Sequence, residues 1–276
     1  MRQRVFRCLF CFLVIQYFGV VTQGRKFTMT LKKFEKMTKT ELLVFCLMGV
    51  SSGVVIGVGA IASLIANSIF GEWGRLIGAC LFAYGIYSIV TYEMRLFTGM
   101  VADIPTLGVK NYWKLPVCFI CNTLGVFLVA LLAYSSPLYE NIVSQAQAVI
   151  GPKLYAENWQ IKAFCSSMIC GVLITLSVKA PKYAPQKGLS ASVGVIFPIL
   201  VFAFGGFDHS VANMMYFFYY GEFSWHVIGY ILLTIVGNIV GGTGLPTITL
   251  LRETAQRHEQ ERAEKKAAHL NAEKQI

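Results

Sequence analysis

The stretch 205–214, GGFDHSVANM, puts two adjacent glycines, an aspartate and a histidine at the end of a long apolar run. No Asp, Glu, Lys or Arg occurs between Gly188 and Phe207, and apolar residues resume at Val211. A run of this length is typical of a membrane-spanning helix, but the glycines and ionisable groups interrupt it. Irregular backbone is tolerated at membrane depth only where it lines a protein cavity or pathway. The stretch therefore predicts an interrupted membrane helix at a functional site.

The rest of the 276-residue chain is also dominated by apolar runs. Hydrophobic residues make up 55% of it and charged residues 14%, too little polar surface to coat a soluble globule. Six runs free of Asp, Glu, Lys and Arg are candidate spans: Leu42–Phe70, Leu76–Tyr92, Leu115–Tyr139, Ala163–Val178, Gly188–Phe207 and Phe223–Leu251. They lack the alternation of membrane β-strands, so we predict an all-α membrane protein with six transmembrane helices. The net charge of +10 lies in loops and tails, and no nucleic-acid partner is expected.

Basic residues gather on one side of this arrangement. If the residues before Leu42 are cytoplasmic, 20 Lys and Arg residues lie on the cytoplasmic side and 3 on the other. The positive-inside rule then predicts a multi-pass protein of the plasma (inner) membrane with both termini in the cytoplasm. Three regions follow: an N-terminal extension and cytoplasmic amphipathic segment (1–40), a six-helix transmembrane domain (41–251) and a charged cytoplasmic C-terminal helix (252–276). Residues 1–28 fit an upstream extension and an interfacial helix equally well.

The second apolar run is interrupted in the same way as the fifth. It ends in EMRLFTG at 93–99 and continues through Asp103 and Pro105. Each half of the chain then carries an Asn-x-x-Gly motif, at Asn122–Gly125 and at Asn238–Gly241. Because each half holds three spans, the two halves must insert in opposite directions. The sequence therefore predicts a 3+3 inverted repeat with two broken helices and a pathway at the interface of the halves.

The residues around the two interruptions resemble those of the formate/nitrite transporter (FNT) family. GFDHSVANM at 206–214 is similar to the family's fifth-helix signature, with Asp208 where Glu is usual, and LFTG at 96–99 is similar to the loop that interrupts the second helix. The resemblance extends from about Leu42 to Leu251. It implies an aquaporin-like protomer with one pore, assembled as a homopentamer, and a membrane channel or transporter for small anions.

The resemblance also implies roles for individual residues. His209 would be a central histidine that hydrogen-bonds toward Thr98, with Asn213 supporting it. Two apolar constrictions would flank it, the outer one at Phe82, Ile86 and Phe202 and the inner one at Leu96 and Phe97.

Three positions depart from the family pattern. Arg95 replaces an acidic residue, Met100 replaces an asparagine that often follows the loop glycine, and Gly171 stands where the fourth helix commonly has asparagine. These changes suggest a divergent subfamily and leave the substrate open.

The charged residues near the pore leave alternatives open. The family's vestibule lysine corresponds to Lys153 or to Lys162. A buried, unpaired guanidinium is costly, so Arg95 is expected to be neutralised by Glu93 or Asp103, or to attract anions.

Such a pore suits the transport of a weak acid. Stripping a small anion of its hydration costs many kcal/mol, whereas protonating an acid of pKa about 3 to 4 at neutral pH costs only about 4 to 5 kcal/mol. A vestibule lysine would attract the anion, and His209 would hand over or polarise a proton between the apolar constrictions. We therefore expect proton-linked passage of small monovalent anions such as formate, nitrite or hydrosulfide.

Other function classes fit the sequence less well. An aquaporin-like channel for neutral solutes shares six spans and broken helices, but its half-helices usually begin at Asn-Pro-Ala, which this chain lacks. An enzyme would need clustered ligands or acids, and His209 and His226 are the only histidines in or near the spans. The CxxC pairs at 8–11 and 118–121 lie inside apolar runs and cannot supply four metal ligands. No enzymatic activity, metal or cofactor is therefore expected.

Overall fold

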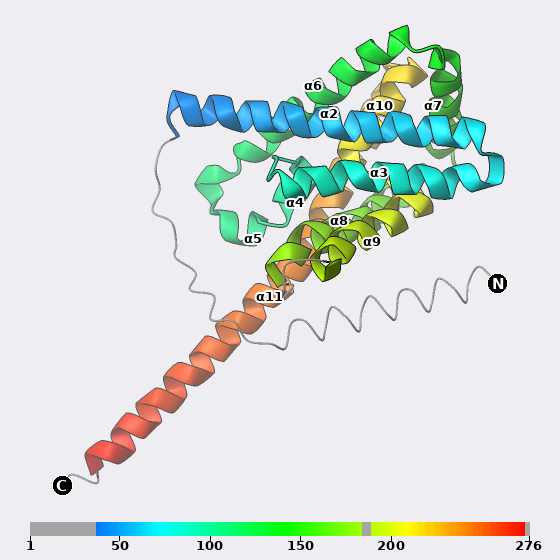
Figure 1. Ribbon diagram of the computed structural model, residues 1–276. Helices are drawn as coiled ribbons and strands as arrows, with labels where there is room; N and C mark the ends of the chain where they lie inside the picture. Colours follow the sequence, from blue (N-terminus) through cyan, green and yellow to red (C-terminus); the bar gives the residue numbers. More distant parts are fainter. Residues whose placement is uncertain (1–36, 184–188, 274–276) are drawn as a thin grey trace.

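The computed structural model describes residues 37–183 and 189–273 (Figure 1). All regular elements in these residues are helices: α2 (Lys39–Ile69), η1 (Gly71–Trp73), α3 (Gly74–Thr91), α4 (Phe97–Val101), α5 (Ile104–Leu107), η2 (Val109–Asn111), α6 (Lys114–Leu132), η3 (Ala133–Ser135), α7 (Tyr139–Leu154), α8 (Trp159–Tyr183), α9 (Leu189–Gly205), α10 (Ser210–Tyr220) and α11 (Trp225–Glu273). Six segments are long and apolar enough to cross a membrane. The predicted all-α class and the six spans are confirmed.

The first crossing begins at a helix-start signal in the sequence. Glu41 N–H donates to the Thr38 hydroxyl at 3.2 Å, and Thr38 N–H donates to the Glu41 carboxylate at 2.7 Å, which makes a capping box. From there α2 runs for 31 residues. At about 1.5 Å per residue it is longer than the roughly 30 Å hydrocarbon core, so it can cross with a tilt.

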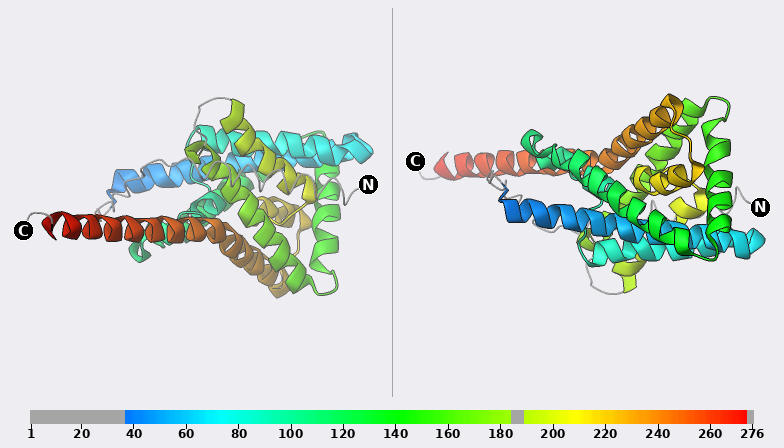
Figure 2. Two further views of the ribbon diagram at one scale, coloured as in Figure 1. Left: turned by 90° about the horizontal axis from the view of Figure 1, so that it is seen from below. Right: turned by 90° about the horizontal axis from the view of Figure 1, so that it is seen from above.

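Two similar groups of helices make up the bundle. In one group α2 packs against α3 and α6, and in the other α8 packs against α9 and α11. Each short helix contacts long helices of the other group, since α4 packs on α8 and α11 while α10 packs on α2 and α6. The helix α7 lies across one end of the bundle, and the start of α2 and the far end of α11 point toward the opposite end (Figure 2).

Glycines let the long helices approach to backbone contact. A Cβ at Gly125 would lie 2.1 Å from the Val50 carbonyl oxygen, and a Cβ at Gly241 would lie 2.0 Å from the Met168 carbonyl oxygen. Contacts of this kind are a common basis of helix association in membranes, where apolar burial alone gives little driving force. The glycine of each Asn-x-x-Gly motif therefore sets the distance between its two helices.

The last helix does not stop at the boundary that the sequence suggests. α11 continues unbroken from Trp225 to Glu273, and its side chains from 254 to 268 are exposed. This part projects away from the bundle as a single rod (Figure 1). The last crossing and the C-terminal helix predicted from residue 252 onward are therefore parts of one continuous helix. The predicted N-terminal extension, residues 1–28, lies outside the described residues.

Candidate functional site

The first interruption separates α3 from α4, and Asn122 of α6 holds its backbone. The Asn122 Oδ1 accepts a hydrogen bond from Phe97 N–H at 2.8 Å, and its Nδ2 donates to the carbonyls of Arg95 and Gly49 at 2.8 Å each. Asn122 is fully buried. Unpaired backbone groups in such a place would each cost about 1–3 kcal/mol. The asparagine thus supplies the partners that the broken helix lacks.

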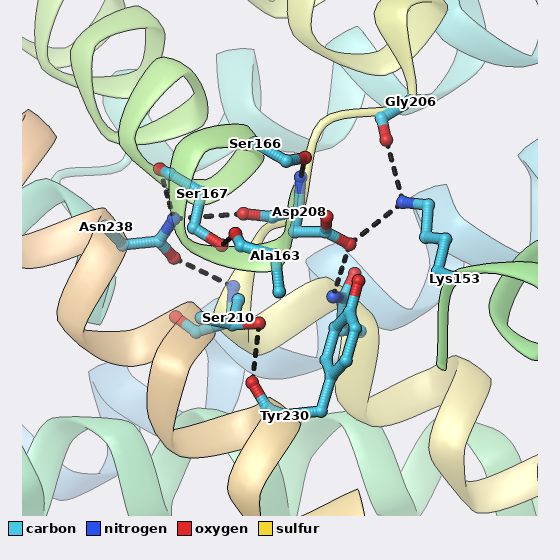
Figure 3. Close-up of polar contacts among 11 residues, drawn as sticks. Lys153, Ala163, Ser166, Ser167, Gly206, Asp208, Ser210, Tyr230 and Asn238 are labelled. Carbon is cyan, nitrogen blue, oxygen red and sulfur yellow. Dashed lines mark hydrogen bonds and ion pairs between the residues drawn. The ribbon is translucent and has the colours of Figure 1, made fainter. Parts of the chain in front are cut away.

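The second interruption separates α9 from α10 and is held in the same way by Asn238 of α11 (Figure 3). The Asn238 Oδ1 accepts from Ser210 N–H at 2.9 Å, and its Nδ2 donates to the carbonyls of Asp208 at 3.0 Å and Ser167 at 2.9 Å. In both halves the amide group joins the residue that opens the short helix, the residue two positions earlier and the neighbouring long helix.

The match between the halves extends to the glycines beside these asparagines. A Cβ at Gly53 would lie 2.0 Å from the Asn122 carbonyl oxygen, and a Cβ at Gly171 would lie 2.4 Å from that of Asn238. Gly171 is one of the departures from the family pattern. The site has no space for an asparagine there, because any side chain would collide with the backbone of α11.

His209 forms the N-cap of α10. Its Nδ1 accepts a hydrogen bond from Ala212 N–H at 3.1 Å, and its Nε2 lies 2.9 Å from the Thr98 hydroxyl oxygen. Both side chains are fully buried. Since a backbone N–H only donates, Nδ1 carries no proton, and in the neutral ring the proton is on Nε2 and points at Thr98. The cap therefore selects the tautomer of the imidazole.

Aromatic rings lie at both interruptions, and one of them contacts His209. The Phe82 and Phe202 rings meet edge to face at 5.4 Å, and Phe202 lies 5.5 Å from the His209 ring. On the other interruption, Phe97 packs edge to face against Phe119 at 5.3 Å. The residues assigned to the two constrictions are all buried: Phe82, Ile86, Phe202, Leu96 and Phe97.

Asp208 precedes the histidine and is the centre of a polar network (Figure 3). Its Oδ1 accepts from Lys153 Nζ at 2.8 Å and from Asn213 Nδ2 at 3.0 Å, while Lys153 also donates to the Gly206 carbonyl at 2.7 Å. Asp208 is 3% exposed and Lys153 27% exposed, so the lysine offers positive charge to solvent while the aspartate does not. Tyr230 of α11 points its hydroxyl toward the same carboxylate.

The structure places the two candidate vestibule lysines and Asn213 relative to the second interruption. Of the two candidate lysines, Lys153 lies at the interruption, and Lys162 is exposed near the start of α8. The hydrogen bond of Asn213 goes to Asp208, so the asparagine supports the aspartate and not, as the resemblance implies, the histidine.

Arg95 is not buried, so the premise of its expected pairing with Glu93 or Asp103 is wrong, whereas attraction of anions by Arg95 stays a prediction. Its side chain is exposed, and only its carbonyl takes part in the interruption. No burial cost has to be offset, because the loop turns the guanidinium outward. Asp103, one of the suggested partners, pairs with Lys179 of α8, and the other, Glu93, is exposed with a positive φ of 52°.

Sequence reasoning missed two cationic residues near the interruptions. Lys179 was counted only as a loop charge, but it lies at the end of α4 through its pair with Asp103. Arg75 of α3 lies against the second interruption, since a Cβ at Gly206 would be 2.6 Å from its Nη2. Gly206 has a φ of +67°, a left-handed conformation that glycine adopts without strain, and the loop turns here.

The fold and the site together define a helical membrane transport protein with two interrupted helices. Residues 25–251 match the family model described as formate/nitrite transporter, and the chain belongs to this family. Its members are channels and transporters, not enzymes.

Curated relatives and solved structures agree with this assignment. "Uncharacterized transporter YrhG" of Bacillus subtilis (strain 168) is 27% identical over 231 residues, covering 75% of this chain and 84% of the relative. "Formate channel FocB" of Escherichia coli (strain K12) is 25% identical over 193 residues, covering 65% and 67%. A structure described as "Pentameric formate channel with formate bound" aligns with a TM-score of 0.64 at 19% identity, covering 75% of this chain and 94% of that one. "FNT family ion channel" aligns with a TM-score of 0.65 at 22% identity, covering 78% and 91%, so both structures show a shared fold.

Proposed function

We propose that this protein conducts small monovalent weak-acid anions of the formate or nitrite type across the plasma (inner) membrane, together with a proton. The observation that carries the proposal is the buried hydrogen bond between His209 and Thr98, which joins the two interruptions and has the Phe202 ring beside it. An imidazole and a hydroxyl in such surroundings can serve a solute that sheds its water and its charge on the way.

The chemistry at the centre follows from the tautomer. The Nδ1 atom of His209 is occupied by the Ala212 N–H, so Nε2 is the atom through which the ring acts on its surroundings. A proton added at Nδ1 would break the helix cap and place a positive charge at the positive end of the α10 dipole. We infer that the ring donates a hydrogen bond through Nε2 and polarises Thr98, whose own hydroxyl proton is then available to an oxygen of the solute. The transported proton comes from the aqueous side with the anion.

Positive charge at one mouth favours the approach of the anion. Lys153 is partly exposed, and Arg75 also lies close to Gly206. Two unit charges at about 4 Å attract by about 4 kcal/mol in the intermediate dielectric of a protein surface. This attraction raises the local concentration of the anion at the mouth of the pathway, where protons are available from the aqueous side.

The two halves support a pathway at their interface. Asn122 and Asn238 make corresponding hydrogen bonds, and Gly125 and Gly241 make corresponding close contacts. We propose that the halves are an inverted repeat in an aquaporin-like protomer and that five protomers assemble, as in the pentameric formate channel with which the chain shares its fold. Both termini would then be cytoplasmic, as the basic residues predict.

Uptake into proteoliposomes tests this proposal. Formate, nitrite, acetate, lactate and hydrosulfide would be offered at external pH of about 5.5 and about 7.5, values that bracket neutrality, with glycerol as a neutral solute. We expect formate or nitrite uptake that is faster at the lower pH and acidifies the lumen. Uptake of hydrosulfide alone would reassign the substrate, and uptake of glycerol without any anion would replace the proposal by a neutral-solute channel.

A further inference from the structure

A cluster of polar and aromatic side chains lies outside the interruptions, where α7 ends and α11 begins. The His226 Nε2 lies 2.8 Å from the carbonyl oxygen of Leu154, the last residue of α7. A carbonyl oxygen only accepts, so Nε2 carries the proton and donates it. The last carbonyls of a helix have no partner within the helix, and the imidazole satisfies one of them.

Two aromatic rings pack against the His226 imidazole. The Tyr155 ring stacks on His226 at 5.4 Å with an angle of 9° between the ring planes, and the Trp159 ring meets it at 4.4 Å and 63°. Packing against these two side chains restricts the orientations that the imidazole can adopt. The packing therefore keeps the imidazole Nε2–H aimed at the Leu154 carbonyl oxygen.

A second set of hydrogen bonds ties the loop before α11 to the same place. Glu222 accepts from the Tyr155 hydroxyl and from the Ser224 hydroxyl, at 2.6 Å each. Both hydrogen bonds lower the pKa of the Glu222 carboxyl, and the one from Ser224 contributes most. The hydrogen bond from Tyr155 to Glu222 is also the main reason why the pKa of Tyr155 is raised to about 12. At neutral pH Glu222 thus stays ionised and Tyr155 stays protonated, so the hydrogen bond between them is kept.

The end of α7 matters because Lys153 precedes Leu154. The Lys153 ammonium reaches across to the Gly206 carbonyl and the Asp208 carboxylate. A lysine side chain loses up to about 2 kcal/mol of rotamer entropy when it is fixed, so its contact depends on where its backbone is held. Leu154 is fully buried, so a contact that holds its carbonyl also holds the backbone of the neighbouring Lys153.

We propose that His226 is a positioning residue that acts through the Leu154 carbonyl to hold Lys153 at Asp208, and so sets the concentration of anion at which transport is half-saturated. The inference rests on the proposed transport of formate-type anions. His226 does not contact the solute. Its loss therefore changes the half-saturating concentration more than the maximal rate.

Two substitutions separate the hydrogen bond from the ring. His226→Phe keeps the aromatic contacts and removes the donor, whereas His226→Gln keeps an N–H at similar reach and removes the aromatic ring. Initial rates of formate uptake by the full chain in proteoliposomes would be measured against external formate. We expect His226→Phe to raise the half-saturating concentration about fivefold, as for one lost hydrogen bond of about 1 kcal/mol, and to leave the maximal rate within about twofold. His226→Gln should restore most of the affinity.

Lys153→Met and a neighbouring control make the test specific. In a Lys153→Met background, His226→Phe should cause no further change, because the lysine through which it acts is gone. Trp225→Phe, next to His226 and 86% exposed, should behave as the wild type does. If His226→Phe does not assemble, His226→Asn, whose shorter donor cannot reach Leu154, takes its place.

The outcomes distinguish this inference from the function on which it rests. Wild-type protein that carries neither formate nor nitrite above the level of empty vesicles would overturn the proposed function. Wild-type transport with an unchanged half-saturating concentration in His226→Phe, or with the same shift in the Lys153→Met background, would overturn the positioning role alone.

Discussion

The two interrupted helices share one scaffold and differ in their chemistry. Asn122 and Asn238 clamp the two loops with the same three hydrogen bonds. The position that caps the short helix is Leu96 in one loop, with no side-chain cap, and His209 in the other, with its Nδ1 as the cap. One position earlier stand the exposed Arg95 and the buried Asp208.

This difference shows which features the two halves need in common and which only one half needs. The clamp satisfies broken backbone in any interrupted membrane helix, so it occurs twice. The histidine cap and the buried carboxylate next to it occur at the second interruption alone, where Lys153 of α7 pairs with that carboxylate. We infer that the first interruption mainly shapes the pathway and contributes Thr98, and that the second supplies the groups that act on the solute.

The largest effect is expected from breaking a clamp. Asn122→Leu or Asn238→Leu should each cost about 3 to 9 kcal/mol, because three buried backbone groups lose their partner at about 1–3 kcal/mol each. Thermal unfolding followed by size-exclusion chromatography in detergent measures the loss. Asn141→Leu, at an exposed position of α7, is the matched control and should unfold as the wild type does. A neutral result at one clamp only would contradict the equivalence of the halves.

Alanine at the motif glycines should give a smaller loss that is equal in the two halves. Gly125→Ala and Gly241→Ala each push a methyl group against a backbone carbonyl, at 2.1 and 2.0 Å, and should cost about 1–3 kcal/mol as the helices separate. Gly244→Ala, where a Cβ meets nothing within 4 Å, should be neutral or slightly stabilising. Thermal unfolding followed by size-exclusion chromatography in detergent measures these losses as well. Unequal losses at 125 and 241 would indicate that the helix pairs are packed differently.

The charged residues before the two caps should respond unequally. Asp208→Asn keeps the size of the side chain but removes the charge that accepts from Lys153 and Asn213, and we expect a loss of about 1–2 kcal/mol, reduced by the partial exposure of the lysine. Arg95→Gln should change stability by less than about 0.5 kcal/mol because its side chain is exposed. If Arg95→Gln were the more harmful change, the guanidinium would have a role that its exposure does not suggest.

The smallest expected effect concerns Glu222 at the start of α11. Hydrogen bonds from Ser224 and Tyr155 lower the pKa of Glu222 in the folded protein, below its ordinary value of 4.5. A depressed folded pKa contributes stability that is present above the unfolded value and is lost as the pH falls through the folded one. The difference in melting temperature between wild type and Glu222→Gln should therefore be present at neutral pH and disappear in acid. A difference that grows in acid would contradict this sign.

Much of the fold could be predicted because its signals are local. Long apolar runs identify the crossings, and glycines with ionisable groups identify the two interruptions. The partners of those interruptions lie far away in the chain, as Lys153 does from Asp208 and Asn122 from Phe97. The sequence therefore left Lys153 and Lys162 as equal candidates, gave no signal for Arg75, and misplaced Arg95, whose orientation depends on how the loop turns.

The most direct test of the account is the proton movement that accompanies formate uptake in variants of His209. His209→Asn keeps an oxygen that can cap α10 and removes the imidazole, and His209→Phe removes both the cap and the donor. Thr98→Val removes the hydroxyl partner and leaves the ring in place. Lumenal pH and formate uptake would be recorded together in proteoliposomes for correctly assembled protein. We predict that both His209 variants lose proton-linked uptake and that Thr98→Val is slowed less. Wild-type rates with unchanged pH dependence in His209→Asn and His209→Phe would contradict the central role of the histidine and leave the apolar constrictions to set selectivity.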